Sequence, residues 1–210
     1  MRKLIEGIVD FRNRILPNCR DTFAELAKGQ NPDVLFITCS DSRVAPNWFA
    51  STNPGELFVI RNVGNLVPPA SSVPSVNESD VSALAAVEFS VLKLNVAHIV
   101  VCGHSECGAM KALAFPTDLE TTPHLKSWLH YGEPSLDKIN RGISLDKKLS
   151  RENQLSQINV LQQIEHLKSY PFIQEQLDQS KIEIHGWWFD IAKADVHSFN
   201  KKTNRFELIE

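Results

Sequence analysis

Short runs of apolar, mostly β-branched residues recur along the chain and predict the strands of a buried sheet. These runs occupy residues 34–38, 56–61, 97–102 and 182–189, and polar or turn-forming residues bound each of them. Nearly continuous apolar runs of this length are typical of parallel strands that are covered on both faces.

Between these runs, apolar residues return at helical spacing. The spacing predicts helices over 3–16, 82–94, 105–113 and 151–169, together with a shorter helix that Pro171 opens. Asp21 is positioned to cap a further helix that runs through Leu26 and stops near Gly29. The segment 67–80 is rich in Pro and Ser and predicts a loop, and residues 115–148 are polar and less regular.

Strands that alternate with helices predict an α/β fold. We expect a single domain, 1–210, with a central, mainly parallel β-sheet flanked by helices. Within it, residues 1–30 would form an N-terminal helical arm and residues 31–210 the α/β core.

Composition excludes several classes of function. The chain has 210 residues, of which 42% are hydrophobic, and a formal net charge of −3. This balance argues against nucleic acid or an anionic membrane as a main partner, because both require a basic surface. No segment has the roughly 20 apolar residues of a membrane helix, and the N-terminus does not resemble a secretory signal. We therefore expect a cytoplasmic protein.

Cysteine and histidine usage indicates metal chemistry instead of a disulfide framework. Cys39 follows the first predicted strand, and His104 and Cys107 follow the third. Carboxyl ends of neighbouring parallel strands converge on one edge of a sheet, where sites form. The separation of three residues between His104 and Cys107 suits one face of a first helical turn. Thiolate and imidazole are ligands that zinc prefers, and three protein ligands with one open position are typical of catalytic zinc.

A carboxylate and a guanidinium accompany the first of these ligands. Asp41 lies two residues after Cys39, and Arg43 two residues after Asp41. Asp41 could bind the metal or accept a hydrogen bond from a bound water, and Arg43 could select between these states by pairing with it. The simpler alternatives are a thiol that only packs at a strand end, a histidine that only completes a loop, and a surface ion pair of about 0–1 kcal/mol.

These residues resemble the β-class carbonic anhydrases of the bacterial type. The motifs are Cys39-Ser40-Asp41-Ser42-Arg43 and His104-x-x-Cys107, and the segments 55–65, 98–110 and 185–187 extend the resemblance along the chain. It implies reversible hydration of carbon dioxide to bicarbonate and a proton, by zinc-hydroxide attack, with Zn²⁺ held by Cys39, His104 and Cys107.

The resemblance also implies roles for residues outside the ligand set. Asp41 would serve the zinc hydroxide, or become a fourth ligand in a closed state, and Arg43 would hold Asp41 in the open state. Gln30 would bind bicarbonate from a neighbouring subunit, and Phe58 and Val63 would line the carbon dioxide pocket. The assembly would be a homodimer or homotetramer, with N-terminal helices that extend onto a partner subunit.

Two positions depart from the family pattern. Phe36 stands where members with an inhibitory bicarbonate site have tryptophan, so we expect no such site and an open zinc centre near neutral pH. Phe89 replaces a common tyrosine, which removes one hydroxyl from the pocket region. The remaining histidines are interpreted as surface or core residues: His98, His124, His130, His166, His185 and His197.

Two alternative functions stay open at this point. A carbon disulfide or carbonyl sulfide hydrolase of the same superfamily would use the same zinc chemistry on a related substrate. A non-catalytic interaction protein stabilised by zinc would need a closed, four-ligand site, for which Asp41 and Arg43 serve no purpose.

Overall fold

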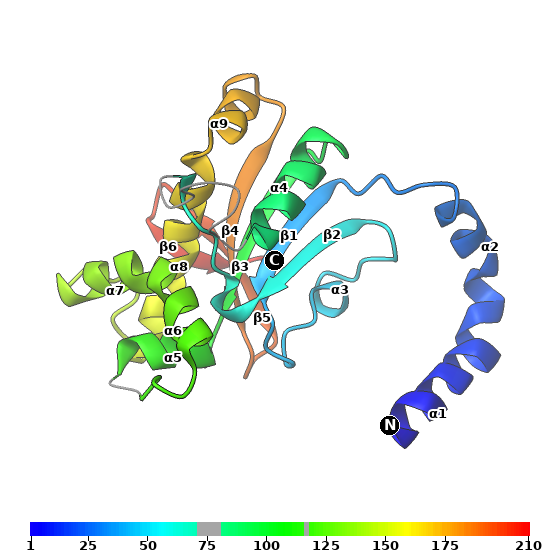
Figure 1. Ribbon diagram of the computed structural model, residues 1–210, viewed down its shortest axis with the longest axis horizontal. Coiled ribbons are helices and arrows are strands. Elements are labelled where there is room, and N and C mark those ends of the chain that lie inside the picture. The colour runs from blue at the N-terminus through cyan, green and yellow to red at the C-terminus, as the bar shows by residue number, and fades with distance from the viewer. Residues whose placement is uncertain (71–80, 116–117) are drawn as a thin grey trace. The chain divides into compact units, whose positions relative to one another are not determined.

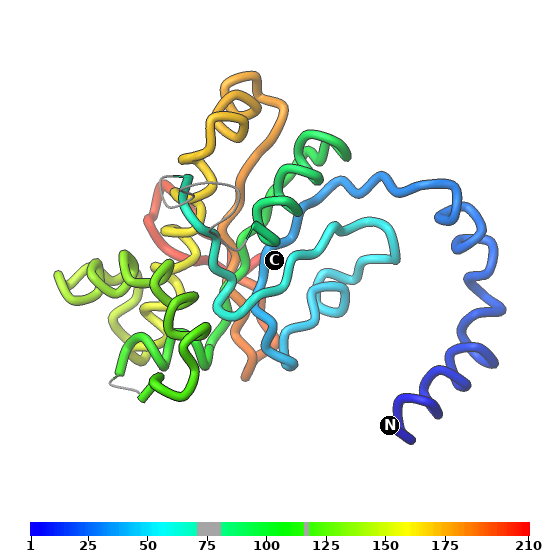
Figure 2. Tube along the Cα trace, in the orientation of Figure 1, coloured from blue at the N-terminus to red at the C-terminus, as the bar shows by residue number. Residues whose placement is uncertain are grey.

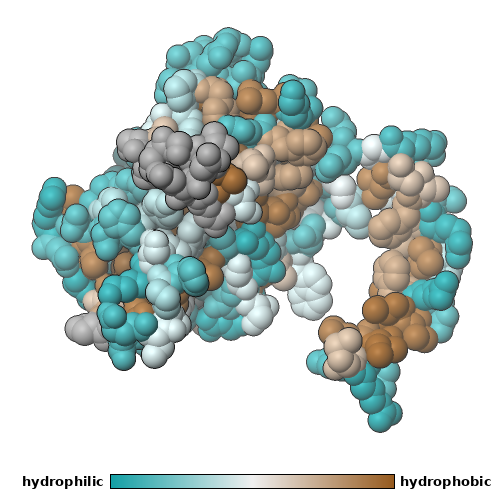
Figure 3. Space-filling model, viewed as in Figure 1, coloured by the Kyte–Doolittle hydropathy of each residue, from teal (hydrophilic) through white to brown (hydrophobic). Residues whose placement is uncertain are grey.

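The computed structural model describes residues 1–70, 81–115 and 118–210, and the chain divides into two compact units, Met1–Asn31 and Pro32–Glu210. The first unit is helical up to Leu26: α1 (Arg2–Asp10), a π-helical turn η1 (Phe11–Ile15) and α2 (Leu16–Leu26) follow one another without a break. None of their residues is buried. Apolar side chains gather along these helices in Figure 3, and the large exposed ones are Leu4, Ile5, Ile8, Val9, Phe11, Ile15 and Phe23.

The second unit is built on a six-stranded sheet in the order β2-β1-β3-β4-β5-β6 (Figure 1). The first four strands in this order are parallel, and β5 and β6 continue the sheet as antiparallel neighbours. The strands are β1 (Val34–Cys39), β2 (Leu57–Asn62), β3 (His98–His104), β4 (Glu183–Asp190), β5 (Asp195–Asn200) and β6 (Arg205–Leu208). A central, mainly parallel sheet flanked by helices is therefore confirmed.

Helices fill the connections between the parallel strands, and the course of the chain can be followed in Figure 2. They are α3 (Pro46–Phe49), α4 (Ser82–Leu92), α5 (Gly108–Ala114), α6 (Pro123–Leu129), α7 (Glu133–Asn140), α8 (Arg151–Lys168) and α9 (Pro171–Asp178), with single 3₁₀ turns η2 (Val63–Asn65) and η4 (His130–Gly132). No helix in the described part of the chain is both long and apolar enough to cross a bilayer.

Alternation along the strands divides the core between the two faces of the sheet. Leu35 and Ile37 of β1 join Ile99 of β3 in a cluster with residues of α4, α8 and α9. Phe36 and Val100 point to the other face, in a smaller cluster that includes Phe49 from α3. This alternation explains why the apolar runs are continuous in sequence, since both faces of the central strands are covered.

Gly103 allows α8 to lie directly against β3. A Cβ atom at this position would come within 2.7 Å of Val160 Cγ2 and 3.1 Å of Ser156 Oγ, both on α8. A carbon–carbon separation of 2.7 Å does not occur in packed proteins, and the backbone oxygen of Ser156 would lie only 3.2 Å away, so a side chain here would press against α8. The close packing at Gly103 thus fixes α8 beside the end of β3, next to His104.

Several local expectations were wrong. Asp21 lies inside α2 and caps no helix, because Leu16 and Pro17 already begin that helix and the chain stays helical from Arg2. The segment 115–148, expected to be irregular, contains α6 and α7, and the β5–β6 hairpin was not anticipated. Of the expected loop 67–80, residues 71–80 lie outside the described residues.

Candidate metal centre

Cys39 is the last residue of β1, and the backbone around it is held from several directions. Its side chain is buried, with 5% of the residue exposed, and its sulfur accepts a hydrogen bond from the backbone N–H of Gly64 at 3.4 Å. Arg61 donates from Nε to the carbonyl of Cys39 and from Nη2 to the carbonyls of Asp41 and Val44. The turn that carries the sulfur is therefore fixed by β2, its neighbour in the sheet.

His104 ends β3, the strand that pairs with β1 on its other side, and its ring is fully buried. Nδ1 lies 2.8 Å from the carbonyl oxygen of Ser105. A carbonyl only accepts, so Nδ1 carries the proton and Nε2 presents its lone pair. Nε2 has no hydrogen-bond partner in the structure. A buried imidazole nitrogen left without a partner is costly, and this one has the orientation of a metal ligand.

Cys107 reaches the same point through a tight turn. The expectation of a first helical turn shared by His104 and Cys107 was wrong, because α5 begins only at Gly108 and Cys107 precedes it in an extended conformation. Glu106 between them adopts the left-handed conformation, with φ of 55°. This reversal of the backbone directs the Cys107 sulfur back toward the end of β3, which a helix could not do from this register.

The three side chains converge. The potential ligand atoms of Cys39, His104 and Cys107 all lie within 4.8 Å of one another, and all three residues are buried. Cys107 donates its S–H to Cys39, which lowers the pKa of Cys39 and raises that of Cys107, so that one proton stays with the pair. Two thiolates and an imidazole suit zinc, and the unpartnered Nε2 shows that the residues present fit a metal ion. Metal binding would displace the shared proton.

Asp41 is held apart from this cluster by Arg43. The Arg43 Nε donates to Asp41 Oδ1 at 2.9 Å and Nη2 donates to Oδ2 at 2.7 Å, a bidentate pair that the Arg43 backbone N–H extends. Nη2 also donates to the carbonyl of Glu106 at 3.0 Å. These bonds hold the pKa of Asp41 well below its usual range, so the carboxylate is charged. The structure thus presents Asp41 beside the thiolate–imidazole cluster and not within it.

A cavity of about 330 Å³ opens over the cluster. Cys39 and Asp41 form its polar end, and Val63 of η2 contributes to its apolar wall. Phe58 lines a neighbouring cavity of about 520 Å³ that shares Ser40 and Val63 with the first, and its ring packs 5.9 Å from that of Phe89. The remaining apolar wall comes from α5 and α6: Ala109, Ala112, Leu125 and Leu129. Gln30 belongs to the N-terminal unit, and its role stays a prediction.

Sequence reasoning missed residues that hold the centre from behind. Gly64 is left-handed, with φ of 80°, and a Cβ atom there would meet the Cβ of Ala109 at 3.0 Å. Asn159 on α8 donates to the Gly64 carbonyl at 3.0 Å and so holds the residue whose N–H reaches Cys39. Trp128 on α6 donates to the carbonyl of Val63 at 2.7 Å. The sequence carries no local signal for Asn159, because its role depends on a contact with a residue 95 positions away.

Comparison with known proteins decides the family. The model of the family described as carbonic anhydrase matches residues 34–196, which include the whole cluster. A solved structure described as the beta-carbonic anhydrase CcaA superposes with a TM-score of 0.90 at 34% identity, covering 100% of this chain and 92% of that one. This chain belongs to the β-class carbonic anhydrases.

Other relatives match nearly the whole of this chain. The carbonic anhydrase of Synechococcus elongatus is 42% identical over 97% of this chain and 73% of the relative. That of Pseudomonas aeruginosa is 37% identical over 98% and 90%. A β-carbonic anhydrase from Sordaria macrospora, described as tetrameric, superposes with a TM-score of 0.81 at 28% identity, over 95% of this chain and 96% of that one.

Proposed function

We propose that this β-carbonic anhydrase reversibly hydrates carbon dioxide to bicarbonate and a proton, with Zn²⁺ held by Cys39, His104 and Cys107. The observation that carries the proposal is the buried cluster itself, in which an imidazole nitrogen without a partner faces two thiols within 4.8 Å. Three protein ligands leave a fourth position free for water, which is the arrangement of a catalytic and not a structural zinc site.

Zinc, when bound, supplies the Lewis acid that makes water nucleophilic near neutral pH. Asp41 accepts a hydrogen bond from the attacking water and directs its lone pair toward the substrate carbon. Arg43 holds Asp41 in this position through its bidentate pair, so little reorganisation is needed at the moment of attack. Asp41 would close the centre if it left Arg43 and became the fourth ligand, and the pair with Arg43 opposes that state.

The cavity supports carbon dioxide as the substrate. Carbon dioxide has no net dipole, and a pocket with an apolar wall and one polar end would admit it while leaving few places for competing water. Val63 would contact it directly, and Phe58 would shape the entrance from the adjoining cavity. Gln30 would bind bicarbonate from a neighbouring subunit.

The same proposal includes assembly into a homodimer or homotetramer. The amphipathic N-terminal helices have no buried residue, and their exposed apolar side chains would be covered by extending onto a partner subunit. The tetrameric relative from Sordaria macrospora supports this. We also propose a cytoplasmic location, which the four unpaired cysteines favour. The partners would be small-molecule substrates, and neither nucleic acid nor a membrane.

The alternative substrates are less well supported. The family match and the relatives all carry the description carbonic anhydrase, which favours hydration of carbon dioxide over hydrolysis of carbon disulfide or carbonyl sulfide. An interaction protein stabilised by zinc would have no use for the charged Asp41 beside the cluster.

The test combines metal analysis with a rapid hydration assay. Purified protein should contain about one zinc per chain and accelerate hydration of carbon dioxide, and chelation should abolish the rate until zinc is returned. Cys39→Ser should lose both the metal and the activity, whereas Cys19→Ser, outside the cluster, should keep both. Zinc-replete protein that hydrates carbon dioxide no faster than buffer would refute the proposal.

A further inference from the structure

A second group of metal-ligating side chains lies at the opposite end of the sheet from the catalytic cluster. Among the residues that the structure describes, His98, Glu183 and His185 form this group, and their potential ligand atoms all lie within 4.8 Å of one another. His98 begins β3 and Glu183 begins β4, whereas His104 ends β3. The proposed function uses none of these three residues.

The strand register places the three on one face of the sheet. His98 pairs directly with Glu183 across the parallel β3–β4 ladder. Glu183 and His185 are two residues apart on β4, so their side chains point the same way. Two ligands on one strand and a third directly opposite form a triangle whose size the sheet itself fixes, with no loop involved.

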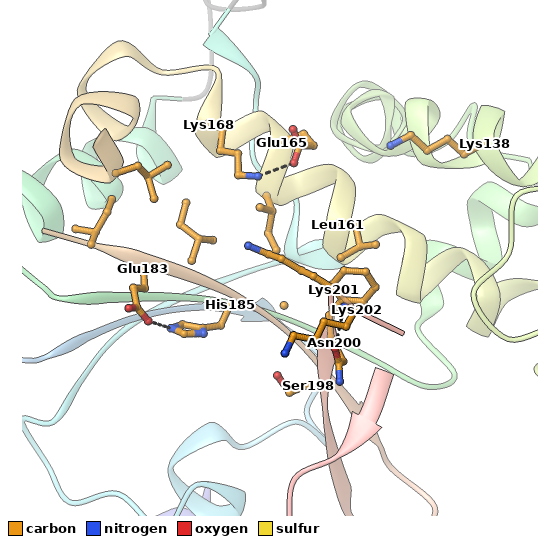
Figure 4. Close-up of a pocket in the computed structure, with 16 residues that line it drawn as sticks. Lys138, Leu161, Glu165, Lys168, Glu183, His185, Ser198, Asn200, Lys201 and Lys202 are labelled. Carbon is orange, nitrogen blue, oxygen red and sulfur yellow. Dashed lines mark hydrogen bonds and ion pairs between the residues drawn. The ribbon is translucent and has the colours of Figure 1, made fainter. Parts of the chain in front are cut away.

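The distances match those of a tetrahedral zinc ion. Ligand atoms that each lie about 2.0 Å from such an ion are about 3.3 Å from one another. The Nδ1 of His98 and the Nε2 of His185 are 3.3 Å apart, and Nε2 of His185 is 3.7 Å from Oε2 of Glu183. Figure 4 shows the His185 ring directed at the Glu183 carboxylate. At 3.7 Å this contact is longer than a hydrogen bond, and it is an ion pair only when His185 is protonated.

The protonation and exposure of the group suit a metal. Burial, assisted by His98 and opposed by Glu183, lowers the pKa of His185 and so favours the neutral ring, whose Nε2 shares a hydrogen bond with Nδ1 of His98 in the absence of an ion. Glu183 has 72% of its side chain exposed and His185 36%, which leaves a path for an ion and for water ligands. Lys201 acts against a cation here because it also lowers the pKa of His185. Its opposition makes this a site weaker than the buried thiolate cluster.

We propose that His98, Glu183 and His185 form a second binding site for a divalent transition metal of the zinc type, distinct from the catalytic centre. Two imidazoles and a carboxylate are a ligand set that zinc accepts, with water completing the coordination. Occupancy would join the first residues of β3 and β4 and stabilise that end of the sheet.

The test is zinc titration of the full-length enzyme with its catalytic metal already loaded. Wild-type protein should bind a second equivalent at micromolar free zinc, seen by calorimetry and by metal analysis after equilibrium dialysis. Glu183→Gln, on an exposed side chain, and His185→Gln should each weaken the second equivalent at least tenfold and leave the first intact. His124→Gln, an exposed histidine outside the group, should titrate as wild type.

Two further measurements separate this site from the catalytic one. Cys39→Ser should lose the tight equivalent and keep the weaker one, with a zinc-dependent rise in melting temperature that His185→Gln abolishes. Cobalt in the weaker site should give visible d–d bands without the near-ultraviolet charge transfer of thiolate ligation. The proposal would be overturned if wild-type protein bound only one equivalent of zinc, or if Glu183→Gln and His185→Gln left the second equivalent unaffected. The group would then be only a hydrogen bond between His98 and His185 beside an exposed carboxylate.

Discussion

Asn153 and Glu106 are joined by two hydrogen bonds that run in opposite directions. Asn153 Oδ1 accepts the backbone N–H of Glu106 at 2.8 Å, and Asn153 Nδ2 donates to Glu106 Oε1 at 2.9 Å. This clamp from α8 holds the left-handed residue between His104 and Cys107. Because the Glu106 carbonyl also accepts from Arg43, the clamp extends to the guanidinium that positions Asp41.

Removing the clamp should lower activity without removing the metal. In Asn153→Ala the left-handed turn loses both bonds, of which the one to the Glu106 carboxylate is worth about 1.5–3 kcal/mol and the neutral one about 0.5–1.5 kcal/mol. We expect kcat/KM to fall about tenfold or more, because the loss of about 1.4 kcal/mol of transition-state stabilisation lowers the rate tenfold. The zinc content, measured on the same sample, should stay near one per chain.

A paired exchange provides the control for Asn153. Asn153→Asp alone places two carboxylates together and should be as impaired as Asn153→Ala. Combined with Glu106→Gln, the new aspartate can accept from both the backbone N–H and the Gln side chain, so the double variant should recover most of the lost rate. Wild-type rates in Asn153→Ala, or no recovery in the double variant, would contradict the positioning role.

The Asp41–Arg43 pair should be separable from metal binding. Asp41→Asn keeps the shape and loses the charge, and we expect it to retain zinc and lose most of its activity. Arg43→Lys keeps a charge but cannot form the planar bidentate pair, so its rate should fall by about tenfold to a hundredfold. Stopped-flow hydration with zinc analysis checks both, and unchanged turnover in Asp41→Asn would refute the proposed role of Asp41 in orienting the attacking water.

Filling the apolar cavity should block the substrate and spare the metal. Ala112 lines the 330 Å³ cavity from α5, and Ala112→Phe would occupy space that carbon dioxide needs. We expect a fall in kcat/KM with about one zinc still bound. The matched control is Ala85→Phe on α4, which does not line this cavity and should change the rate little if the protein folds.

His166 should make the fold less stable in mild acid. Its Nδ1 donates to the Val67 carbonyl at 2.8 Å, and burial lowers its pKa from the ordinary 6.5. As the pH falls through about 6.5, the unfolded chain therefore takes up a proton that the folded chain refuses, and stability is lost. His166→Asn keeps a donor and cannot titrate, so its unfolding free energy should depend less on pH between about 5 and 6.5.

Denaturant titration across that range measures the effect, with His124→Asn as the exposed control. His185, whose pKa is also lowered, contributes a slope of the same sign that both variants retain. Identical pH profiles for wild type and His166→Asn would show that His166 does not carry the effect.

The strands and the convergence of Cys39, His104 and Cys107 were predictable because both depend on short-range patterns. A buried parallel strand must be apolar on both faces, so 34–38 and 97–102 stand out, and a site at the carboxyl edge follows from the strand ends. The bounds shifted by only a few residues at β1 and β3.

Other features depend on tertiary contacts that the pattern does not encode. The reversal at Glu106 is made by Asn153, 47 residues away, and no local motif announces a left-handed glutamate. Asn159 and Gln163 are polar residues of α8, yet both are buried, because they bind backbone groups of the η2 segment and its continuation. α6 and α7 were missed because each is only seven or eight residues long; α6 packs over the cavity through Leu125 and Leu129, and α7 packs against α8.

Gly103 couples the position of His104 at the end of β3 to the position of α8. Any side chain at 103 would push against Val160 and Ser156, and the displaced helix carries the amides that hold both Glu106 and Gly64. A larger residue at position 103 should therefore be tolerated only if residues 156 and 160 are replaced by smaller ones at the same time. Sequence variation among relatives should therefore concentrate in the loops over the proposed metal site. Such variation would alter the access of substrate and leave the arrangement of Cys39, His104 and Cys107 unchanged.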